Sequence, residues 1–537
     1  MSSPLLAIDA LRVSIGAAEI LKDVSLEVGA GEIIGLVGAS GSGKSMTALA
    51  VMDLLPAGAL MAGAVRLRGD RLETGNAAAM RARRGRDIGM IFQEPMSALN
   101  PLMSIGAQVA ETVRLHRPSS RRQANRLARE ALDAVGLSGE QGALDRLPYE
   151  LSGGQRQRVA IAMAIVLSPA VLIADEPTTA LDVITQAQVL RLLKDLAHSR
   201  RMGLLFITHD LAVVSELTDR VAVLHEGRVV EQGATGALLN QPQDDYTRRL
   251  IAASRLSPKR DRVRSVEGRQ VLEAGNIVRE YPRKRRSLFR ASMPLRAVDG
   301  VSLRVQAGET VGLVGESGSG KSSFLKVVLA LQRAQSGELH LLGETFPCTS
   351  VADMRRLRRS VQVVFQDPVS SFDGRWPVER IIAEPFYLLD TTPTPAERRR
   401  RVDEVLEQVG LRPQDAVRLP HEFSGGQRQR IAIARALITQ PALIAFDEAV
   451  SALDVLVRDQ ILQLLADLAA REKLAYLFVT HDLHVIRAIA DRIYVMQNGR
   501  IVEEGATEDI FNAPQNPYTR ALIEATPTIH LGSLMPS

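Results

Sequence analysis

Short apolar runs recur along the chain, and each ends at a small or charged residue. Their length and their flanking residues predict buried strands of a parallel sheet. Mostly helical stretches lie between them, at residues 103–135 and 378–409, and short alternating segments at residues 11–28 and 271–305 predict a small sheet at the start of each half. This order of elements implies a parallel α/β core, a small antiparallel β subdomain and an inserted helical subdomain. The apolar runs are residues 33–37, 171–174, 204–207, 310–314, 442–446 and 474–479.

The whole pattern occurs twice, which predicts two domains of the same fold. The heptapeptide Ser-Gly-Gly-Gln-Arg-Gln-Arg begins at Ser152 and again at Ser424, and the pairs and triplets Phe-Gln, Asp-Glu and Thr-His-Asp recur in the same order around it. A polar, basic stretch without periodicity separates the two halves and predicts a flexible linker. The predicted bounds are residues 5–253 for the first domain, 254–269 for the linker, 270–527 for the second domain and 528–537 for a loose tail.

Two glycine-rich segments have the spacing of a phosphate-binding loop, and each follows an apolar run and precedes a helical segment. Glycines let backbone N–H groups curl around a phosphate, and the helix N-terminus adds partial positive charge. We expect Lys44 and Lys321 to reach the terminal phosphates of a nucleoside triphosphate. This context, met twice, favours two nucleotide sites over two structural glycine turns. The loop residues are Gly38, Ala39, Ser40, Gly41, Ser42, Gly43, Lys44 and Ser45 in the first half and Gly315, Glu316, Ser317, Gly318, Ser319, Gly320, Lys321 and Ser322 in the second.

Two carboxylates end one apolar run in each half, where ligand sites of α/β proteins form. They are Asp175-Glu176 and Asp447-Glu448. Alternation along a strand points neighbouring side chains in different directions, so the two members of a pair can do different work. The aspartates are placed to hold Mg²⁺, together with the loop hydroxyls of Ser45 and Ser322, and the glutamates to orient or deprotonate an attacking water. The alternative, strands merely capped by acidic residues, is disfavoured by the phosphate loop in the same half.

One histidine follows a further apolar run in each half, within the triplet Thr-His-Asp. A single histidine at a strand end usually has a structural role. The recurrence of His209 as His481 favours a functional role for both.

The composition is that of a globular protein, with 46% apolar and 24% charged residues and a formal net charge of +5 over 537 residues. Because Cys348 is the single cysteine, the chain forms no intramolecular disulfide and no cysteine-based zinc or iron–sulfur site, and a reducing cytoplasmic location fits. The longest apolar run, residues 159–174, is broken by Ser168-Pro169 and is too short to span a bilayer. Any membrane association is therefore expected to be peripheral.

Taken in order, the motifs resemble the nucleotide-binding domains of ATP-binding cassette (ABC) proteins. These motifs are the phosphate loop, Phe-Gln, Leu-Ser-Gly-Gly-Gln, the run ending in Asp-Glu, Ala-Leu-Asp and Thr-His-Asp, and they occur in both halves, with Phe423 in place of the leucine in the second. In that family two domains face each other head to tail, and each ATP is sandwiched between the phosphate loop of one and the Leu-Ser-Gly-Gly-Gln signature of the other. The resemblance implies ATP and Mg²⁺ as cofactors, an ATPase activity and an intramolecular pair of halves.

Carried over, the resemblance implies two composite sites. Gln93 and Gln366, from the Phe-Gln pairs, would contact Mg²⁺ and take part in catalysis with the glutamates and histidines. Adenine would stack on Tyr281 in the second half, whereas the first half offers Ile15, which suggests weaker adenine binding there. Because both glutamates are present, our hypothesis is that both sites hydrolyse ATP. One site joins the first phosphate loop, Gln93, Asp175, Glu176 and His209 to Ser424, Gly425, Gly426 and Gln427; the other joins the second loop, Gln366, Asp447, Glu448 and His481 to Ser152, Gly153, Gly154 and Gln155.

Two features are similar to those of ABC importers of peptides and nickel. The first is the segment after each Phe-Gln pair. The second is the ending of each half, Pro514-Gln515-Asn516-Pro517-Tyr518-Thr519 and, with a weaker resemblance, residues 242–247. The resemblance implies two transmembrane permease subunits, an extracytoplasmic solute-binding protein and a peripheral location on the cytoplasmic face of the inner membrane. Peptides are the first expectation for the solute, with nickel, glutathione and opine-like solutes as alternatives.

A twin-cassette ATPase acting on ribosomes or nucleic acid is the rival class. The short, proline-containing linker and the absence of zinc modules or long coiled coils disfavour it. The basic runs carry few aromatic residues and are interpreted as solvated faces, with anionic lipid as the alternative partner, so no nucleic acid is expected. Kinase and GTPase classes leave the duplicated Ser-Gly-Gly-Gln segment unexplained.

Overall fold

The computed structural model describes residues 3–93, 98–137, 143–179, 181–255, 269–282, 294–347, 350–451 and 453–529. The chain divides into two compact units, one of Met1–Arg255 with Pro527–Ser537 and one of Leu256–Thr526, and each is described by itself. The predicted linker lies almost entirely outside the described residues, as does the predicted tail apart from residues 528 and 529. Thr528 contacts helix α8 of the first unit (Leu211–Leu217), where its backbone N–H donates to Glu216 Oε1 at 3.0 Å.

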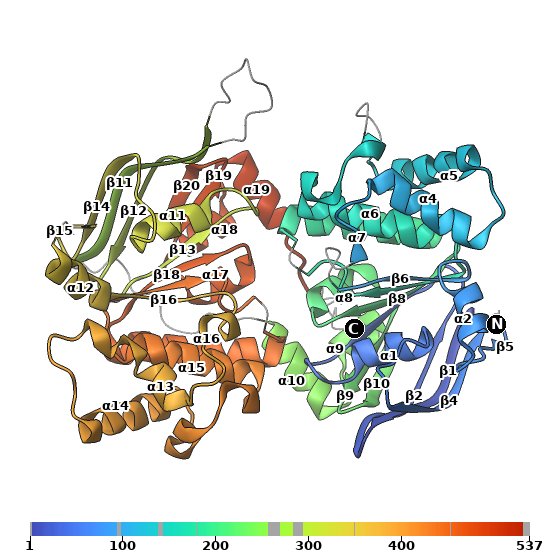
Figure 1. Cartoon of the computed structure of the whole chain (residues 1–537), viewed down its shortest axis with the longest axis horizontal. Coiled ribbons are helices and arrows are strands. Elements are labelled where there is room, and N and C mark those ends of the chain that lie inside the picture. The colour runs from blue at the N-terminus through green and yellow to red at the C-terminus, as the bar shows by residue number, and fades with distance from the viewer. Residues whose placement is uncertain are drawn as a thin grey trace, which may run out of the picture. The chain divides into compact units, whose positions relative to one another are not determined.

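The first unit has two sheets (Figure 1). The small one is antiparallel, in the order β2-β1-β4-β5, and the large one has the order β10-β9-β3-β8-β7-β6, with only β10 antiparallel to its neighbour. The strands are β1 (Leu6–Ile15), β2 (Ala18–Val28), β3 (Ile33–Val37), β4 (Ala59–Leu67), β5 (Asp70–Arg71), β6 (Ile88–Ile91), β7 (Val171–Asp175), β8 (Gly203–Thr208), β9 (Arg220–His225) and β10 (Arg228–Ala234).

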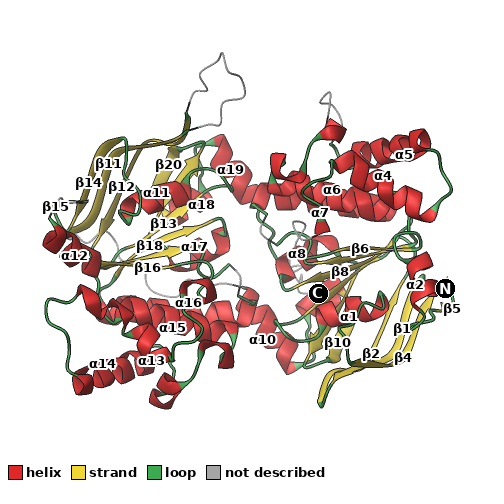
Figure 2. Cartoon of the chain, in the orientation of Figure 1, coloured by secondary structure: helices red, strands yellow, loops and turns green. Residues whose placement is uncertain are grey.

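Helices cover both faces of the large sheet (Figure 2). Alternate strand residues point to opposite faces, so Leu172 and Phe206 pack toward the helices of the inserted subdomain, whereas Ile173 and Ile207 pack toward α1 and the small sheet. Two hydrophobic cores result, one on each face. The helices are α1 (Lys44–Val51), α2 (Ala77–Arg83), α4 (Ile105–His116), α5 (Arg121–Ala134), α6 (Gly153–Ile165), α7 (Val183–Ser199), α8, α9 (Thr235–Asn240) and α10 (Asp245–Ser254), with the 3₁₀ turns η1 (Ala143–Asp145) and η2 (Pro148–Glu150).

The second unit repeats this topology, with a small sheet in the order β12-β11-β14-β15 and a large sheet in the order β16-β17-β18-β13-β19-β20. Its strands are β11 (Gln270–Tyr281), β12 (Leu295–Gln306), β13 (Thr310–Val314), β14 (Ser336–Leu341), β15 (Glu344–Thr345), β16 (Val361–Val364), β17 (Leu443–Asp447), β18 (Ala475–Thr480), β19 (Arg492–Gln497) and β20 (Arg500–Ala506). Its helices are α11 (Lys321–Val328), α12 (Val351–Ser360), α13 (Val378–Ile382), α14 (Pro395–Gln408), α15 (Gly425–Leu437), α16 (Val455–Glu472), α17 (Leu483–Ile489), α18 (Thr507–Asn512) and α19 (Pro517–Glu524), with 3₁₀ turns η3 (Val369–Ser371), η4 (Glu384–Leu388), η5 (Pro413–Val417) and η6 (Pro420–Glu422).

The predicted fold class is confirmed in both units. The first helix of the inserted subdomain differs between the units: α4 runs unbroken, whereas α13 ends at Ile382 and continues as the 3₁₀ turn η4. Pro385 accounts for the break, because proline lacks the N–H that would continue an α-helix. In the part of the chain that the structure describes, none of the helices is long and apolar enough to cross a membrane.

Candidate nucleotide-binding sites

Each phosphate loop connects the central strand of the large sheet to the helix that follows. Gly38 has φ 157°, and a Cβ on it would lie 2.1 Å from the carbonyl oxygen of Leu224, in the neighbouring strand β9. A Cβ on Gly315 would lie equally close, at 2.1 Å, to the carbonyl oxygen of Met496 in β19. The first glycine of each loop is therefore required by the close approach of the adjacent strand.

The lysine of each loop is buried against the loop's own backbone. Lys44 Nζ donates to the carbonyl oxygens of Gly38 and Ala39, both at 2.9 Å. Lys321 Nζ makes the corresponding contacts with Gly315 at 2.7 Å and Glu316 at 2.8 Å. Both ammonium groups therefore lie at the loop, where the sequence predicts that they meet phosphate.

Glu176 is at the centre of a hydrogen-bonded cluster at the C-terminal end of β7. Gln93 Nε2 donates to Glu176 Oε2 at 2.9 Å, Thr179 Oγ1 donates to the same oxygen at 3.1 Å, and His209 Nδ1 lies 2.9 Å from Oε1. Burial alone would raise the pKa of Glu176, but the hydrogen bond and charge of His209, the hydroxyl of Thr179 and the charge of Lys44 outweigh it and lower the pKa to about 2. The carboxylate is therefore ionised and firmly held.

The second unit has a similar but smaller cluster. Gln366 Nε2 donates to Glu448 Oε2 at 2.9 Å, and His481 Nδ1 lies 3.0 Å from Glu448 Oε1. In place of Thr179, this unit has Ser451, whose hydroxyl donates to the backbone oxygen of Glu448 rather than to its carboxylate. Burial would raise the pKa of Glu448, but the hydrogen bond and charge of His481 lower it below its usual range.

Both glutamates have a left-handed backbone. The φ angle is 45° at Glu176 and 48° at Glu448, a conformation that residues with a side chain seldom adopt. Each is held in it by a backbone hydrogen bond to the next strand, from Glu176 N–H to Ile207 and from Glu448 N–H to Val479. Strain of this kind, about 1–2 kcal/mol per residue, is typical of functional sites.

In the first unit, the aspartate of the Asp-Glu pair contacts the start of the helix that follows the loop. Ser45 Oγ donates to Asp175 Oδ1 at 3.2 Å, so a hydroxyl and a carboxylate oxygen meet where Mg²⁺ is predicted. Burial raises the pKa of Asp175, and it also raises the pKa of Asp447. Oxygen ligands of this kind suit a hard divalent cation, whose charge would offset that burial.

The signature segments begin helices α6 and α15. Ser152 and Gln155 form a reciprocal capping box, and Ser424 and Gln427 form the same box in the second unit. Two glycines after each serine leave the helix N-terminus open to a ligand, while Gly154 also lies against α7: a Cβ on it would be 2.2 Å from the methyl carbon Cγ2 of Thr185.

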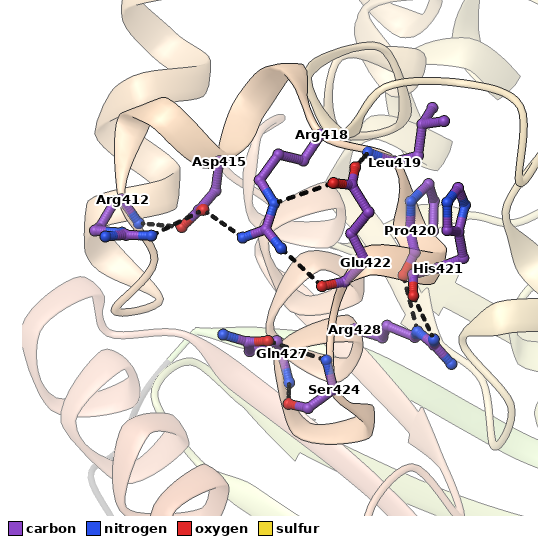
Figure 3. Close-up of polar contacts among 10 residues, drawn as sticks. All are labelled: Arg412, Asp415, Arg418, Leu419, Pro420, His421, Glu422, Ser424, Gln427 and Arg428. Carbon is purple, nitrogen blue, oxygen red and sulfur yellow. Dashed lines mark hydrogen bonds and ion pairs between the residues drawn. The ribbon is translucent and has the colours of Figure 1, made fainter. Parts of the chain in front are cut away.

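A chain of ion pairs supports the second signature from the preceding turns η5 and η6 (Figure 3). Asp415 is buried and accepts from the backbone N–H of Arg412 at 3.1 Å and from Arg418 Nη1 at 3.0 Å. Arg418 Nη2 in turn donates to the carbonyl oxygen of Glu422 at 2.7 Å, two residues before Ser424. The start of α15 is thus anchored to the helical subdomain by charged groups.

Tyr281, the predicted adenine platform, is at the end of β11. Arg279 covers its ring, with the guanidinium carbon 4.8 Å from the ring centroid, and its hydroxyl donates to Gln332 Oε1 at 2.5 Å. Residues 283–293, which follow it, lie outside the described residues. Adenine stacking on Tyr281 stays a prediction, as does weaker binding opposite Ile15.

Sequence reasoning missed three residues that contact the predicted sites. Thr179 holds the carboxylate of Glu176, and the hydroxyls of Tyr246 and Tyr518 accept hydrogen bonds from the backbones of the two phosphate loops. The tyrosines recur at the same place in both halves, so the repeat contained the signal. Thr179 is replaced by Ser451 in the second half, and recurrence could not reveal it.

Each phosphate loop shares a sheet with an ionised glutamate and with an aspartate that is buried in the first unit and half-buried in the second, which is the arrangement of a phosphate-loop ATPase. The family model "ABC transporter" matches residues 21–179 and 298–451, and the model "Oligopeptide/dipeptide transporter, C-terminal region" matches residues 502–534. The chain belongs to the ABC transporter family and carries two ATP-binding cassettes. The predicted family and ATPase class are confirmed.

Curated relatives align along nearly the whole chain. The glutathione import ATP-binding protein GsiA of Escherichia coli (strain K12) is 45% identical over 538 residues, which cover 94% of this chain and 86% of GsiA. The peptidoglycan transport ATP-binding protein YejF of Agrobacterium fabrum is 44% identical over 531 residues, which cover 98% of this chain and 96% of YejF. Among solved structures, the ATP-binding cassette MJ0796 bound to ADP and Pi is 28% identical with a TM-score of 0.40, and the match covers 44% of this chain and 98% of that one.

Proposed function

We propose that this chain is the ATP-hydrolysing subunit of an importer for peptide-like solutes. The observation that carries the proposal is a hydrogen-bonded cluster of glutamine, glutamate and histidine in each unit, around Glu176 and Glu448, in a chain whose C-terminal region matches that of oligopeptide and dipeptide transporters. Two relatives named for transport of glutathione and peptidoglycan support it, because both of these solutes contain peptide bonds.

The partners follow from this function. Two transmembrane permease subunits would form the pathway, and an extracytoplasmic binding protein would deliver the solute. The chain would then lie against the cytoplasmic face of the inner membrane. Because the ATPase subunit does not contact the solute, the choice among peptides, glutathione, nickel and opine-like solutes rests with the permease and the binding protein.

The residues would share the work in the same way at both sites. Each phosphate loop would bind one ATP, which the signature of the other half would cover, with the helix dipole at Ser-Gly-Gly facing the γ-phosphate. Bound Mg²⁺ would neutralise charge on the phosphates. Its protein ligands would be Ser45, Gln93 and Asp175 at the first site and Ser322, Gln366 and Asp447 at the second.

Glu176 and Glu448 would orient the attacking water. Each carboxylate already accepts a hydrogen bond from a glutamine and contacts a histidine, and its two oxygens have further lone pairs with which to accept one from water. We expect the glutamine to turn to Mg²⁺ and the histidine to turn to the γ-phosphate. These turns would occur only when nucleotide and Mg²⁺ are bound, and they would leave the carboxylate to the water.

Glu176→Gln and Glu448→Gln test the two sites separately in steady-state ATPase assays. If both sites hydrolyse ATP, each variant lowers the rate by about half or more and the double variant abolishes it, because the amide cannot accept the proton of water. Loss of all activity in Glu448→Gln, with none lost in Glu176→Gln, would show that the first site only binds ATP. Lys44→Ala and Lys321→Ala control for nucleotide binding itself.

The importer assignment is tested by purifying the chain from its own cells. Co-purification with two membrane proteins of several spans, and ATPase stimulation by the solute-loaded binding protein, are the expected results. Co-purification with ribosomes or nucleic acid in their place would contradict import and leave the ATPase intact.

A further inference from the structure

A tyrosine from the C-terminal segment of each unit contacts the phosphate loop of the same unit. The hydroxyl oxygen of Tyr246 accepts a hydrogen bond from the backbone N–H of Ala39 at 2.8 Å. In the second unit, the hydroxyl oxygen of Tyr518 accepts one from the backbone N–H of Glu316 at 2.9 Å. Ala39 and Glu316 are the second residues of their loops, so the same contact occurs twice at equivalent positions.

The contacted residue also binds the loop lysine. The carbonyl oxygen of Ala39 accepts from Lys44 Nζ at 2.9 Å, and that of Glu316 accepts from Lys321 Nζ at 2.8 Å. Two hydrogen bonds in series therefore connect each tyrosine to the lysine that is expected to bind phosphate.

The tyrosines are themselves held in place. Tyr246 is 5% and Tyr518 is 9% exposed, so neither ring is free to swing away from its loop. Tyr246 also stacks on His225, with ring centroids 3.8 Å apart. Both residues lie in the first turn of a helix, α10 or α19, whose N-cap side chain accepts from the tyrosine's own N–H.

A carboxylate on the edge strand of the large sheet fixes the start of each of these helices. In the first unit, Glu231 of β10 accepts from the backbone N–H groups of Gln243 at 2.9 Å and Asp244 at 3.1 Å. In the second, Glu503 of β20 accepts from Gln515 at 2.7 Å and Asn516 at 3.1 Å. The position of each hydroxyl is thus set by the same sheet that carries the phosphate loop.

We propose that Tyr246 and Tyr518 are positioning residues for nucleotide binding, which hold the second residue of each phosphate loop so that the loop and its lysine keep the geometry that phosphate requires. The inference rests on the proposed function, since it assumes that both loops bind nucleotide. It gives the C-terminal segment of each half a role in ATP binding. The segment of the second half lies within residues 502–534, which match the oligopeptide and dipeptide transporter model. Neither tyrosine touches the reacting atoms, so its effect is on affinity and not on the chemical step.

Tyr518→Phe removes the hydroxyl and keeps the ring. The affinity of the second site for MgADP is measured by titration in a chain whose first site is silenced by Lys44→Ala. We expect the Kd to rise about 3- to 10-fold, the effect of one lost net hydrogen bond. Tyr246→Phe in a Lys321→Ala chain is expected to do the same at the first site.

Tyr476→Phe is the matched control. Tyr476 is a fully buried tyrosine of the same unit, and its hydroxyl donates to the backbone oxygen of Leu465 at 3.2 Å, away from the loop. We expect it to lower the melting temperature as Tyr518→Phe does and to leave the Kd for MgADP unchanged. A purely structural role for Tyr518 would give both variants the same unchanged Kd, and a change of less than 2-fold in Tyr518→Phe would overturn the inference.

Failure of the proposed function would look different. In that case the Lys44→Ala chain with Tyr518 intact would not bind MgADP, or a further Lys321→Ala substitution would leave its binding unaltered. Binding that depends on Lys321 and is insensitive to Tyr518→Phe would reject the positioning role alone.

Discussion

The requirement for glycine at position 154, in the first signature, can be tested by adding a methyl group there and then removing the methyl group of Thr185. In Gly154→Ala the new Cβ would lie 2.2 Å from Thr185 Cγ2, whereas ordinary contacts begin at 3.4 Å, so helices α6 and α7 must separate by about 1.2 Å. Overpacking of this size costs about 1–3 kcal/mol, and the better helix propensity of alanine offsets at most about 1 kcal/mol of it. Thr185 also donates through its N–H and its hydroxyl to the two carboxylate oxygens of Asp182, the N-cap of α7, so the start of α7 is disturbed as well.

The assay is amide hydrogen exchange of the whole chain, read by mass spectrometry in peptides that cover residues 150–165 and 182–190. A net loss of about 1–2 kcal/mol corresponds to exchange that is about 5- to 30-fold faster in these peptides. Thr185→Ser is the compensating change, because it deletes Cγ2 and keeps the hydroxyl that binds Asp182. The next nearest atoms of residue 185 are then 3.5 and 3.6 Å from the new methyl, which is ordinary contact.

The double variant is therefore expected to recover most of the protection that Gly154→Ala loses, with a coupling energy of about 1–2 kcal/mol between the two sites. If its exchange stays as fast as in Gly154→Ala, crowding against Thr185 is not what requires glycine there. If protection recovers and the ATPase rate does not, glycine has a second role, in the approach of the ligand.

Two further predictions concern the second unit. Arg458 Nη1 lies 3.0 Å from Asp482 Oδ2. Burial raises the pKa of Asp482, but the charges of Arg458 and His484 and a backbone N–H outweigh burial, and the net shift of the pKa is downward. The ionised carboxylate therefore contributes fully to stability above about pH 4, and this contribution is lost as the pH falls. Arg458→Met should lower the free energy of unfolding of this unit at pH 7 by about 1–3 kcal/mol, and its melting temperature with it, and should make the melting temperature in calorimetry depend less on acid pH. An unchanged acid profile would contradict the pairing. The Arg435 side chain is 14% exposed and donates to the carbonyl oxygen of Ser371 at 2.8 Å, whereas the first half has Met163 at the equivalent position. Because the hydrogen bond is lost, Arg435→Met should speed amide exchange in residues 366–374 by about 3- to 10-fold. Met163→Arg should not slow amide exchange in the first half.

Much of the fold could be predicted from the sequence because its strongest signals are local and occur twice. The buried run 33–37 and the pair Asp175-Glu176 identify strands, their carboxyl ends and the residues they deliver. What could not be predicted depends on contacts between distant segments. The hydrogen bond from Thr179 to Glu176 and the crowding of Gly154 by Thr185 depend on where helices meet, and nothing in the spacing of the residues reports that.

The candidate sites divide in the same way. Motif spacing locates the glutamine, aspartate, glutamate and histidine of each cluster, because these residues lie at strand ends that a parallel sheet brings to one edge. It does not locate Tyr246, more than two hundred residues from Ala39, although its recurrence as Tyr518 offered a clue. The helical pattern of residues 378–409 does not report the break after Ile382, although its cause, Pro385, stands in the sequence.

The left-handed backbone at Glu176 and Glu448 bears on how such a chain changes over evolutionary time. At both positions the backbone favours glycine, asparagine or aspartate, and under the proposed function it is hydrolysis that would keep a glutamate there. If one of the two sites ceased to matter for transport, its glutamate would be free to drift toward those smaller residues, and the drift would relieve strain. A glutamate in both halves is thus what selection for hydrolysis at both sites would maintain.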